Sequence, residues 1–277
     1  MRKTTAILAT LTGIFLVASS VCAQTAPRPK SQSELDGLKA IDAAPSVDLK
    51  LQKIDDFLAA FADSDYKLLL LDQAVGMAAE KNDYPLAMAW GQRDLDVNPN
   101  SYVAMQALAN VTANNTKEFD LDKDKKLAQA EKWANGALEA LKTAPRPFQY
   151  PEEKWPDIKK FFQASCHVAL GMTAMDRKKF DAAATEFQTA FDTMPEPAYL
   201  IRVGEASLKG GKLDNAVAAF DKVLATPDLN PVVKGVADRE KAEALRRKGV
   251  PAATPVKAAT PPPPAAPPPP ADTPQAK

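Results

Sequence analysis

The residues of this 277-residue sequence best suited to chemistry are Cys166 and His167, which stand next to each other. A histidine can activate a cysteine as a nucleophile when the two side chains lie within hydrogen-bonding distance. Successive residues of an α-helix point about 100° apart, so neighbours on a helix do not face each other. We therefore favour a structural role for both residues, with an unactivated thiol at Cys166.

A short glycine-containing segment, Gly210-Gly211-Lys212, is similar to part of a phosphate-binding loop. Such a loop carries Ser or Thr after the lysine and follows a β-strand. Here Leu213 follows the lysine, and the segment lies between two predicted helices. We expect a turn between helices.

A third candidate is the acidic segment 120–131, which carries carboxylates at its first, third, fifth and twelfth positions. This spacing matches a calcium-binding EF-hand loop. The sixth position, however, is Lys125, where such a loop needs glycine for a sharp turn, and two further lysines would repel a divalent cation. We favour an insertion whose aspartates stabilise the start of a helix near Lys123, with calcium binding as a minor alternative.

Charge and composition exclude several other classes of protein. The 35 basic residues balance 35 acidic ones, so no net charge favours nucleic acid or a general membrane surface. One histidine and two cysteines exclude a zinc site built on these residues and a disulfide framework. No paired carboxylates, Ser-His-Asp set or dinucleotide fingerprint can be placed. We expect a non-enzymatic protein without cofactor or metal.

The first 23 residues are predicted to be a secretory signal peptide. A short cationic start precedes an apolar run, and small residues precede a cleavage point after Ala23. A lipoprotein site at Cys22 is a weaker alternative, because the residues before it do not fit. No later stretch approaches the ~20 apolar residues of a membrane-spanning helix. We expect an exported mature chain, periplasmic or secreted, that does not insert into a membrane.

The last residues, 250–277, form a Pro/Ala-rich tail that holds 11 of the 24 prolines. Prolines at this density favour an extended polyproline II conformation and cannot build a core. We predict a disordered, solvated spacer. Binding to a proline-recognising partner and attachment to the cell envelope are the alternatives.

Between these ends, residues 31–249 have the composition of helices nearly throughout, and they contain an internal repeat. Three pairs of residues share a spacing of 33 positions: Gly171 with Gly204, Ala183 with Ala216, and Phe187 with Phe220. Three matches at one spacing are unlikely to arise by chance, so the sequence predicts stacked copies of one helical unit.

The repeat resembles the tetratricopeptide repeat (TPR) family, a helix–turn–helix unit of about 34 residues. Gly171 and Ala183 stand where that pattern has small residues, which let two helices approach, and Phe187 fills the space beside them. Pro195 ends the second helix of the unit. The resemblance implies an all-α fold, a right-handed α-solenoid of stacked repeats. In residues 68–101, Val75 replaces the glycine and Gly91 replaces the aromatic residue.

The chain is divided accordingly. A linker is expected at 24–40 and the TPR-like domain at 41–249, with 31–66 similar to a degenerate helical pair. The clear repeats are 68–101, 102–143 (with an insertion), 164–197 and 197–230, followed by a capping helix at 231–248. A stiff connector, residues 145–156, holds four prolines and three aromatic residues. We expect its aromatics to cover the junction between the second and third repeats, with ligand binding as the alternative.

In TPR proteins the first helix of each repeat faces a concave groove that binds peptides or protein segments. Carried over by repeat position, the resemblance implies a partner-binding groove at Asp72, Gln106, Asn110, Val168, Met172, Ile201, Arg202 and Glu205. Members that bind chaperones hold a terminal carboxylate with Lys, Asn and Arg; only Arg202 suits that role here, so that subtype is not expected.

The leading hypothesis is a protein-interaction scaffold or adaptor of the bacterial cell envelope; the bacterial assignment rests on similarity to exported repeat proteins. An alternative is an envelope-assembly or peptidoglycan-associated factor that uses the proline-rich tail as a spacer. An enzyme is the third hypothesis. It predicts turnover that a Cys166→Ala or acidic-segment variant would abolish, and we expect none.

Overall fold

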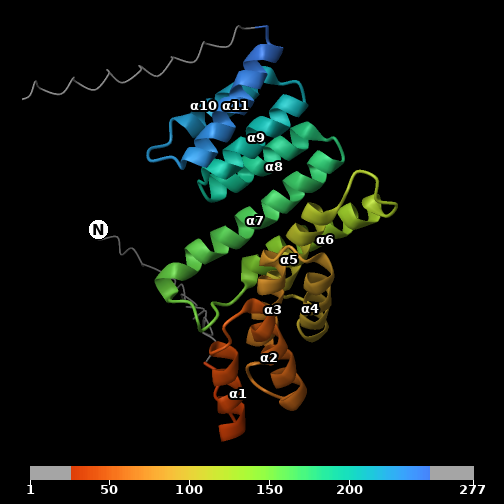
Figure 1. Ribbon diagram of the computed structural model, residues 1–277, viewed down its shortest axis with the longest axis vertical. Coiled ribbons are helices and arrows are strands. Elements are labelled where there is room, and N and C mark those ends of the chain that lie inside the picture. Colours follow the sequence, from red (N-terminus) through yellow and green to blue (C-terminus); the bar gives the residue numbers. More distant parts are fainter. Residues whose placement is uncertain (1–25, 250–277) are drawn as a thin grey trace, which may run out of the picture.

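The computed structural model describes residues 26–249, in which eleven α-helices and one short 3-10 helix form without any strand (Figure 1). The helices are α1 (Gln32–Asp42), α2 (Val47–Ala60), α3 (Lys67–Glu80), α4 (Tyr84–Val97), α5 (Tyr102–Asn115), α6 (Lys123–Thr143), η1 (Glu152–Lys154), α7 (Trp155–Asp176), α8 (Phe180–Thr193), α9 (Pro197–Lys209), α10 (Leu213–Leu224) and α11 (Pro231–Arg247). The predicted signal peptide and proline-rich tail lie outside the described residues.

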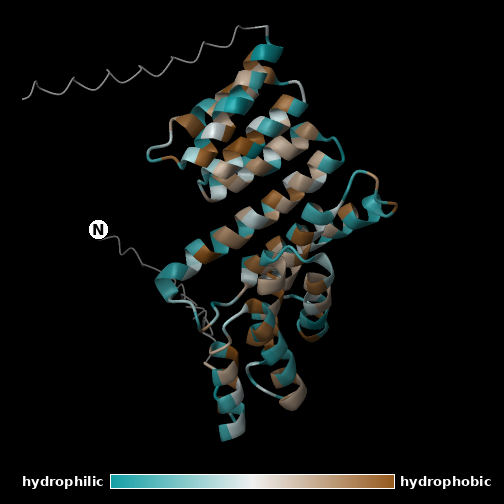
Figure 2. Cartoon of the chain, in the orientation of Figure 1, coloured by the Kyte–Doolittle hydropathy of each residue, from teal (hydrophilic) through white to brown (hydrophobic). Residues whose placement is uncertain are grey.

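The helices stack in chain order, as a TPR-type solenoid requires. Each helix packs against the next, and the first helices of successive pairs also contact one another, α3 with α5 and α5 with α7. Apolar and polar residues alternate along the helices (Figure 2), because each helix contacts neighbours on one side and solvent on another. The all-α solenoid predicted from the repeat is confirmed.

The repeated glycines are needed because an aromatic ring fills the place of their missing side chains. A Cβ atom on Gly171 would lie 2.6 Å from Cδ1 of Phe187, and one on Gly204 would lie 2.5 Å from Cε1 of Phe220. Both phenylalanines are fully buried. The spacing of 33 residues therefore arises because the same glycine–phenylalanine packing occurs in two successive repeats.

In the α3–α4 pair, the larger residue lies on the first helix and the glycine on the second, the reverse of the later repeats. Val75 is fully buried on α3, and a Cβ on Gly91 of α4 would lie 2.6 Å from Cδ2 of Leu108. The space that an aromatic residue of the same repeat fills at Gly171 is here filled by Leu108 of the following helix, α5. The departure from the repeat pattern is thus compensated across the junction between repeats.

Side-chain caps fix where several helices begin. Ser31, Ser46, Asp83, Ser101 and Asn230 each accept a hydrogen bond from a backbone N–H in the first turn that follows. Such caps satisfy donors that the helix itself leaves free. The last helix, α11, begins at Pro231 and is followed by Gly249 in the left-handed region (φ 75°).

The prediction that residues 24–40 form a linker is wrong from Gln32 onward, because α1 occupies Gln32–Asp42. Ser31 caps α1, and Glu34 is buried, where it accepts hydrogen bonds from Ser64 and from the backbone of Lys30. Gly37 allows α1 to approach closely, since a Cβ there would lie 2.9 Å from Phe57. The helical domain therefore begins before residue 41.

Helices α6 and α7 are the longest of those within residues 26–249. Helix α6 has 21 residues and α7 has 22, and α7 begins at Trp155, ahead of the third repeat expected from residue 164. No helix within residues 26–249 is both long and apolar enough to span a membrane.

Candidate functional site

A cavity of about 630 Å³ lies across three consecutive first helices, α3, α5 and α7. The connector closes one side with Phe148, Gln149 and Tyr150. The lining of the cavity is mixed, with aromatic rings from the connector and α7, and with amides and carboxylates from α3 and α5. The three helices that line it are first helices, which the repeat pattern expects to face a groove.

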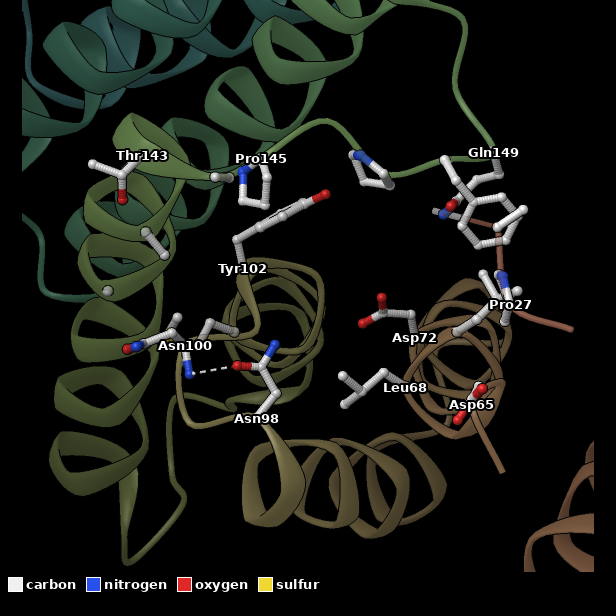
Figure 3. A pocket seen from close by; sticks show the side chains of 18 of the residues that line it. Pro27, Asp65, Leu68, Asp72, Asn98, Asn100, Tyr102, Thr143, Pro145 and Gln149 are labelled. Atoms are coloured by element: carbon white, nitrogen blue, oxygen red, sulfur yellow. Dashed lines mark hydrogen bonds between the residues drawn. The ribbon is translucent and has the colours of Figure 1, made fainter. Parts of the chain in front are cut away.

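A second cavity, of about 1060 Å³, adjoins the first (Figure 3). Residues 26–28, α3, the start of α5, the end of α6 and the connector surround it. Five residues line both cavities: Leu69, Asp72, Tyr102, Phe148 and Gln149. The two cavities are therefore compartments of one surface, which we call the inner groove.

Three of the predicted groove residues meet in the inner groove. Asp72, Gln106 and Asn110 all line its smaller compartment. Gln106 Nε2 donates to Ser165 Oγ at 2.7 Å, and Asn110 Nδ2 donates to the Ser165 carbonyl oxygen at 3.1 Å. These bonds tie α5 to α7, so they hold two walls of the groove in fixed register.

Three other predicted groove residues are part of the core instead. Val168 and Met172 are buried in the cluster around Phe187, and Ile201 is buried in the cluster around Phe220. None of them lines either compartment of the inner groove. Their apolar side chains are covered by adjacent helices, which repeat position alone does not reveal.

Arg202 and Glu205 on α9 are half-buried and lie outside the inner groove. The Arg202 guanidinium lies 5.7 Å from the centre of the Phe187 ring, a cation–π contact. Burial raises the pKa of Glu205 above its ordinary value, and nearby Arg202 opposes that rise. They form a second polar surface, separate from Asp72, Gln106 and Asn110.

Beside the floor of the groove, two carboxylates share one hydroxyl. Ser101 Oγ lies 3.2 Å from Asp72 Oδ1 and 3.2 Å from Asp94 Oδ2, and it accepts the N–H of Ala104 at 3.1 Å. Asp94 is fully buried, and its Oδ1 has no hydrogen-bond partner within residues 26–249. Burial, and secondarily the nearby Asp94, raises the pKa of Asp72 to about 8; burial also raises the pKa of Asp94.

This carboxylate pair was missed in the sequence, although a signal was present. Asp94 stands at the position in repeat 68–101 that Ala190 occupies in repeat 164–197. Both residues are fully buried. An ionisable residue is costly to the fold where other repeats bury a small apolar residue. Asp94 could have been noticed in the sequence for this reason.

The aromatic residues of the connector pack across the junction between the second and third repeats, as expected. Tyr150 stacks on Trp155 with ring centres 6.2 Å apart, and Tyr102 lies 6.2 Å from Trp155 and 5.1 Å from Phe162. Arg146 Nη1 donates to the Tyr150 carbonyl oxygen at 2.6 Å. The connector is thereby held against α5 and α7 as a wall of the inner groove.

Cys166 and His167 have separate surroundings in the structure. Cys166 is fully buried, and burial raises the pKa of its thiol to about 12, so a reactive thiolate does not form near neutral pH. His167 Nδ1 lies 2.8 Å from Oε2 of Glu186, a contact between α7 and α8. Gly211, with φ 76°, forms part of the turn between α9 and α10.

Residues 120–131 do not form an EF-hand loop, because α6 begins at Lys123 and most of the segment is helix. The Asp120 carboxylate is already occupied: it accepts the N–H of Lys117 at 3.0 Å and pairs with Lys126 Nζ at 2.9 Å. Among residues 26–249 no group of three or more His, Cys, Asp or Glu side chains could hold a metal ion.

Comparison with known proteins agrees with this fold. No family model matches the chain. The crystal structure of TTC0263, a thermophilic TPR protein of Thermus thermophilus, superimposes with a TM-score of 0.51 at 17% identity, covering 77% of this chain and 99% of that one. The chain therefore has the fold of a TPR protein.

One curated protein is similar in sequence, the flagellar outer arm dynein beta chain of Chlamydomonas reinhardtii. It is 23% identical over 184 residues, which is 64% of this chain but 3% of the dynein chain. A match over so small a part of that protein carries no function to this one.

Proposed function

We propose that this chain is a non-enzymatic scaffold whose inner groove binds an extended segment of a protein partner. The observation that carries the proposal is the cavity of about 630 Å³ that crosses α3, α5 and α7. TPR-type folds serve in general as protein-interaction scaffolds, and stacked repeats create extended concave binding surfaces.

The chemistry of the lining suits a peptide backbone. Gln73, Asn114 and Gln149 line the groove and are exposed, and their side-chain amides hydrogen-bond to no other residue within 26–249. Amide side chains both donate and accept hydrogen bonds, which matches the alternating donors and acceptors of an extended main chain. Partially exposed Phe161 and Tyr150 offer apolar contact for partner side chains.

Gly76 gives a direct test of groove binding. It lines the groove on α3, and a Cβ added to it would meet nothing within 4 Å. A Gly76→Trp variant should fold, because helix interiors favour other residues over glycine, and its indole should occupy the groove. Affinity capture followed by mass spectrometry should then lose at least one partner that the unchanged chain recovers.

Gly235→Trp is the matched control. Gly235 lies in α11, where a Cβ also meets nothing within 4 Å, and it lines neither compartment of the inner groove. Recovery of identical partners by the unchanged chain and both variants would contradict groove binding. An Arg202→Ala, Glu205→Gln double variant tests in the same way whether the α9 surface extends the contact.

We also propose that the chain is exported to the bacterial envelope, on the basis of the sequence of residues 1–23. Fusion of an alkaline phosphatase, which is active only after export, should give enzyme activity that deletion of 1–23 abolishes. The alternative role in envelope assembly predicts that deletion of 251–277 changes envelope fractionation while partner capture is retained. Unchanged location after that deletion favours the scaffold alone.

A further inference from the structure

We infer that the inner groove selects a partner segment carrying a lysine or arginine side chain, whose cation pairs with Asp72. This inference rests on the proposed function, because it names the chemistry of the segment that the groove would bind. It follows from the charge of the lining, the placement of Asp72, and the number of hydrogen-bond donors available to the two carboxylates.

The smaller compartment is lined by acidic side chains and by no basic one. Its charged lining residues are Asp72 and Glu80, and no Lys, Arg or His side chain lines it. No ion pair forms at either carboxylate among the described residues, in contrast to Asp65 in the larger compartment, which pairs with Lys30 at 3.3 Å. A cationic side chain in the smaller compartment would therefore meet no resident cation, and the ionised carboxylates would attract it.

Asp72 is placed to receive such a cation. It lines both compartments, and Figure 3 shows its carboxylate directed into the space that Tyr102 and Asn98 also surround. Phe148 and Tyr102 line both compartments as well. Aromatic rings suit the aliphatic stem of lysine or arginine and interact favourably with its charge.

Among the described residues, the carboxylates of Asp72 and Asp94 share a single side-chain hydrogen-bond donor. The Ser101 hydroxyl has a single proton but lies 3.2 Å from a carboxylate oxygen of each aspartate. Two ionised carboxylates would share that one donor, and Asp94 Oδ1 has none among the described residues. The pair consequently retains a proton near neutral pH, and a bound cation would replace it, releasing the proton to solvent.

Few other titratable or charged groups lie close enough to alter the replacement of this proton by a cation. The groups facing Asp72 are Asp94 from α4, Ser101 and Tyr102 from the start of α5, and Tyr150 from the connector. The remaining charged residues of the groove lining are Arg28, Asp65, Glu80 and Glu139. Glu139 pairs with Lys142, and α2 contributes no residue to either compartment.

The sign of the resulting pH dependence is fixed. Below the Asp72 pKa of about 8, binding must expel a proton, so affinity should rise by up to tenfold per pH unit as pH approaches 8. Above that value the carboxylate is already ionised, and affinity should stay level until the ligand lysine itself titrates at a pH of ~10.4.

The test is a selection of random dodecapeptides displayed on phage against the full chain at pH 8.5, followed by anisotropy measurements on the selected peptides. We expect lysine or arginine at a common position. Changing that residue to norleucine, or changing the protein by Asp72→Asn, should each weaken binding at least tenfold, and the two changes together should cost little more than one. Affinity for the unchanged chain should fall tenfold or more at pH 6.5.

Asp56→Asn is the control, because it removes the same charge from an exposed part of α2. Equal weakening by Asp56→Asn and Asp72→Asn would mean long-range attraction and overturn the inference. Peptides that lack a basic residue, yet are excluded by Gly76→Trp, would overturn it while the proposed function stands. Failure to select any peptide that Gly76→Trp excludes would count against the proposed function itself. The norleucine and pH measurements decide the inference even if Asp72→Asn fails to fold.

Discussion

At the scale of single residues, the most unusual feature is the Asp94 carboxyl group, which is fully buried beside a second acid. A buried carboxylate without full hydrogen bonding is costly, and the usual outcome is that it takes up a proton. Ser101 reduces the cost with its one hydroxyl and at the same time caps α5. The pair is therefore more costly at high pH, where the retained proton is lost.

This arrangement predicts how stability depends on pH. Because burial raises the pKa values of Asp72 and Asp94 in the folded chain, that chain binds more protons than the unfolded one between about pH 4 and 8. The pair's contribution is fully present below that interval and is lost as pH rises through it. Asp94→Asn should therefore gain stability relative to the unchanged chain as pH rises through that interval, by ~1.4 kcal/mol per pH unit for each proton that the pair no longer retains.

Urea denaturation followed by circular dichroism at pH 5, 6.5 and 8 measures this difference directly. A difference between the two proteins that stays constant with pH would show that neither acid titrates abnormally. Asp56→Asn, at an exposed position paired with Lys53, is the matched control and should show little change.

At the scale of helices, the crossing points are set by which residue on each helix is small. Gly171 and Gly204 face buried rings, so α7 with α8 and α9 with α10 approach closely. Gly76 on α3 faces open space in the groove instead. Gly171 and Gly204 therefore allow close helix packing, whereas Gly76 leaves part of the groove surface open.

Alanine substitution should separate these roles. Gly171→Ala forces its new methyl group against Phe187, and overpacking of this kind costs about 1–3 kcal/mol. Gly76→Ala meets nothing and should stabilise the chain by about 0.5–1 kcal/mol, because alanine is the better helix former. Midpoints of urea unfolding measure both. Equal effects of the two changes would refute the packing role of Gly171.

At the scale of the whole molecule, the core is divided along the solenoid. Within residues 26–249, four buried clusters follow one another, from the one around Phe57 and Trp90 to the one around Phe220 at α9–α11. In a stacked repeat protein, stability is approximately a sum of repeat and neighbour terms. The two ends can therefore lose structure separately, and the inner groove depends on the N-terminal part.

Ala244 in α11 tests this division. It is fully buried against the last cluster, whereas Ala242 on the same helix is exposed. Ala244→Glu should undock α11 and speed amide hydrogen exchange in α9 and α10, while α3 and α5 remain protected. Ala242→Glu should leave exchange unchanged throughout. Loss of protection in α3 together with α9 would mean one cooperative core and contradict the division.

The sequence determined much of this outcome through local rules. A small residue and a ring recurring at 33 positions predicted the helical pairs, since each unit must bury the same face against its neighbour. The departures at Val75 and Gly91 were visible, but the compensating Leu108 lies in the next repeat, and no pattern within one unit pointed to it. The helix α1 was partly assigned to a linker because its packing on Phe57 is a contact between elements.

For the site, the sequence predicted groove positions for Asp72, Gln106 and Asn110, and the structure brings all three to one cavity, because repeat position fixes the face of a helix. The sequence could not separate them from Val168, Met172 and Ile201, whose equivalent positions are covered. Whether a side chain is open depends on the neighbouring helices and on the connector that folds back over α5. The sequence thus determined which side of each helix faces inward. Only the tertiary structure decided where that side remains exposed, because burial results from contacts between segments distant in the sequence.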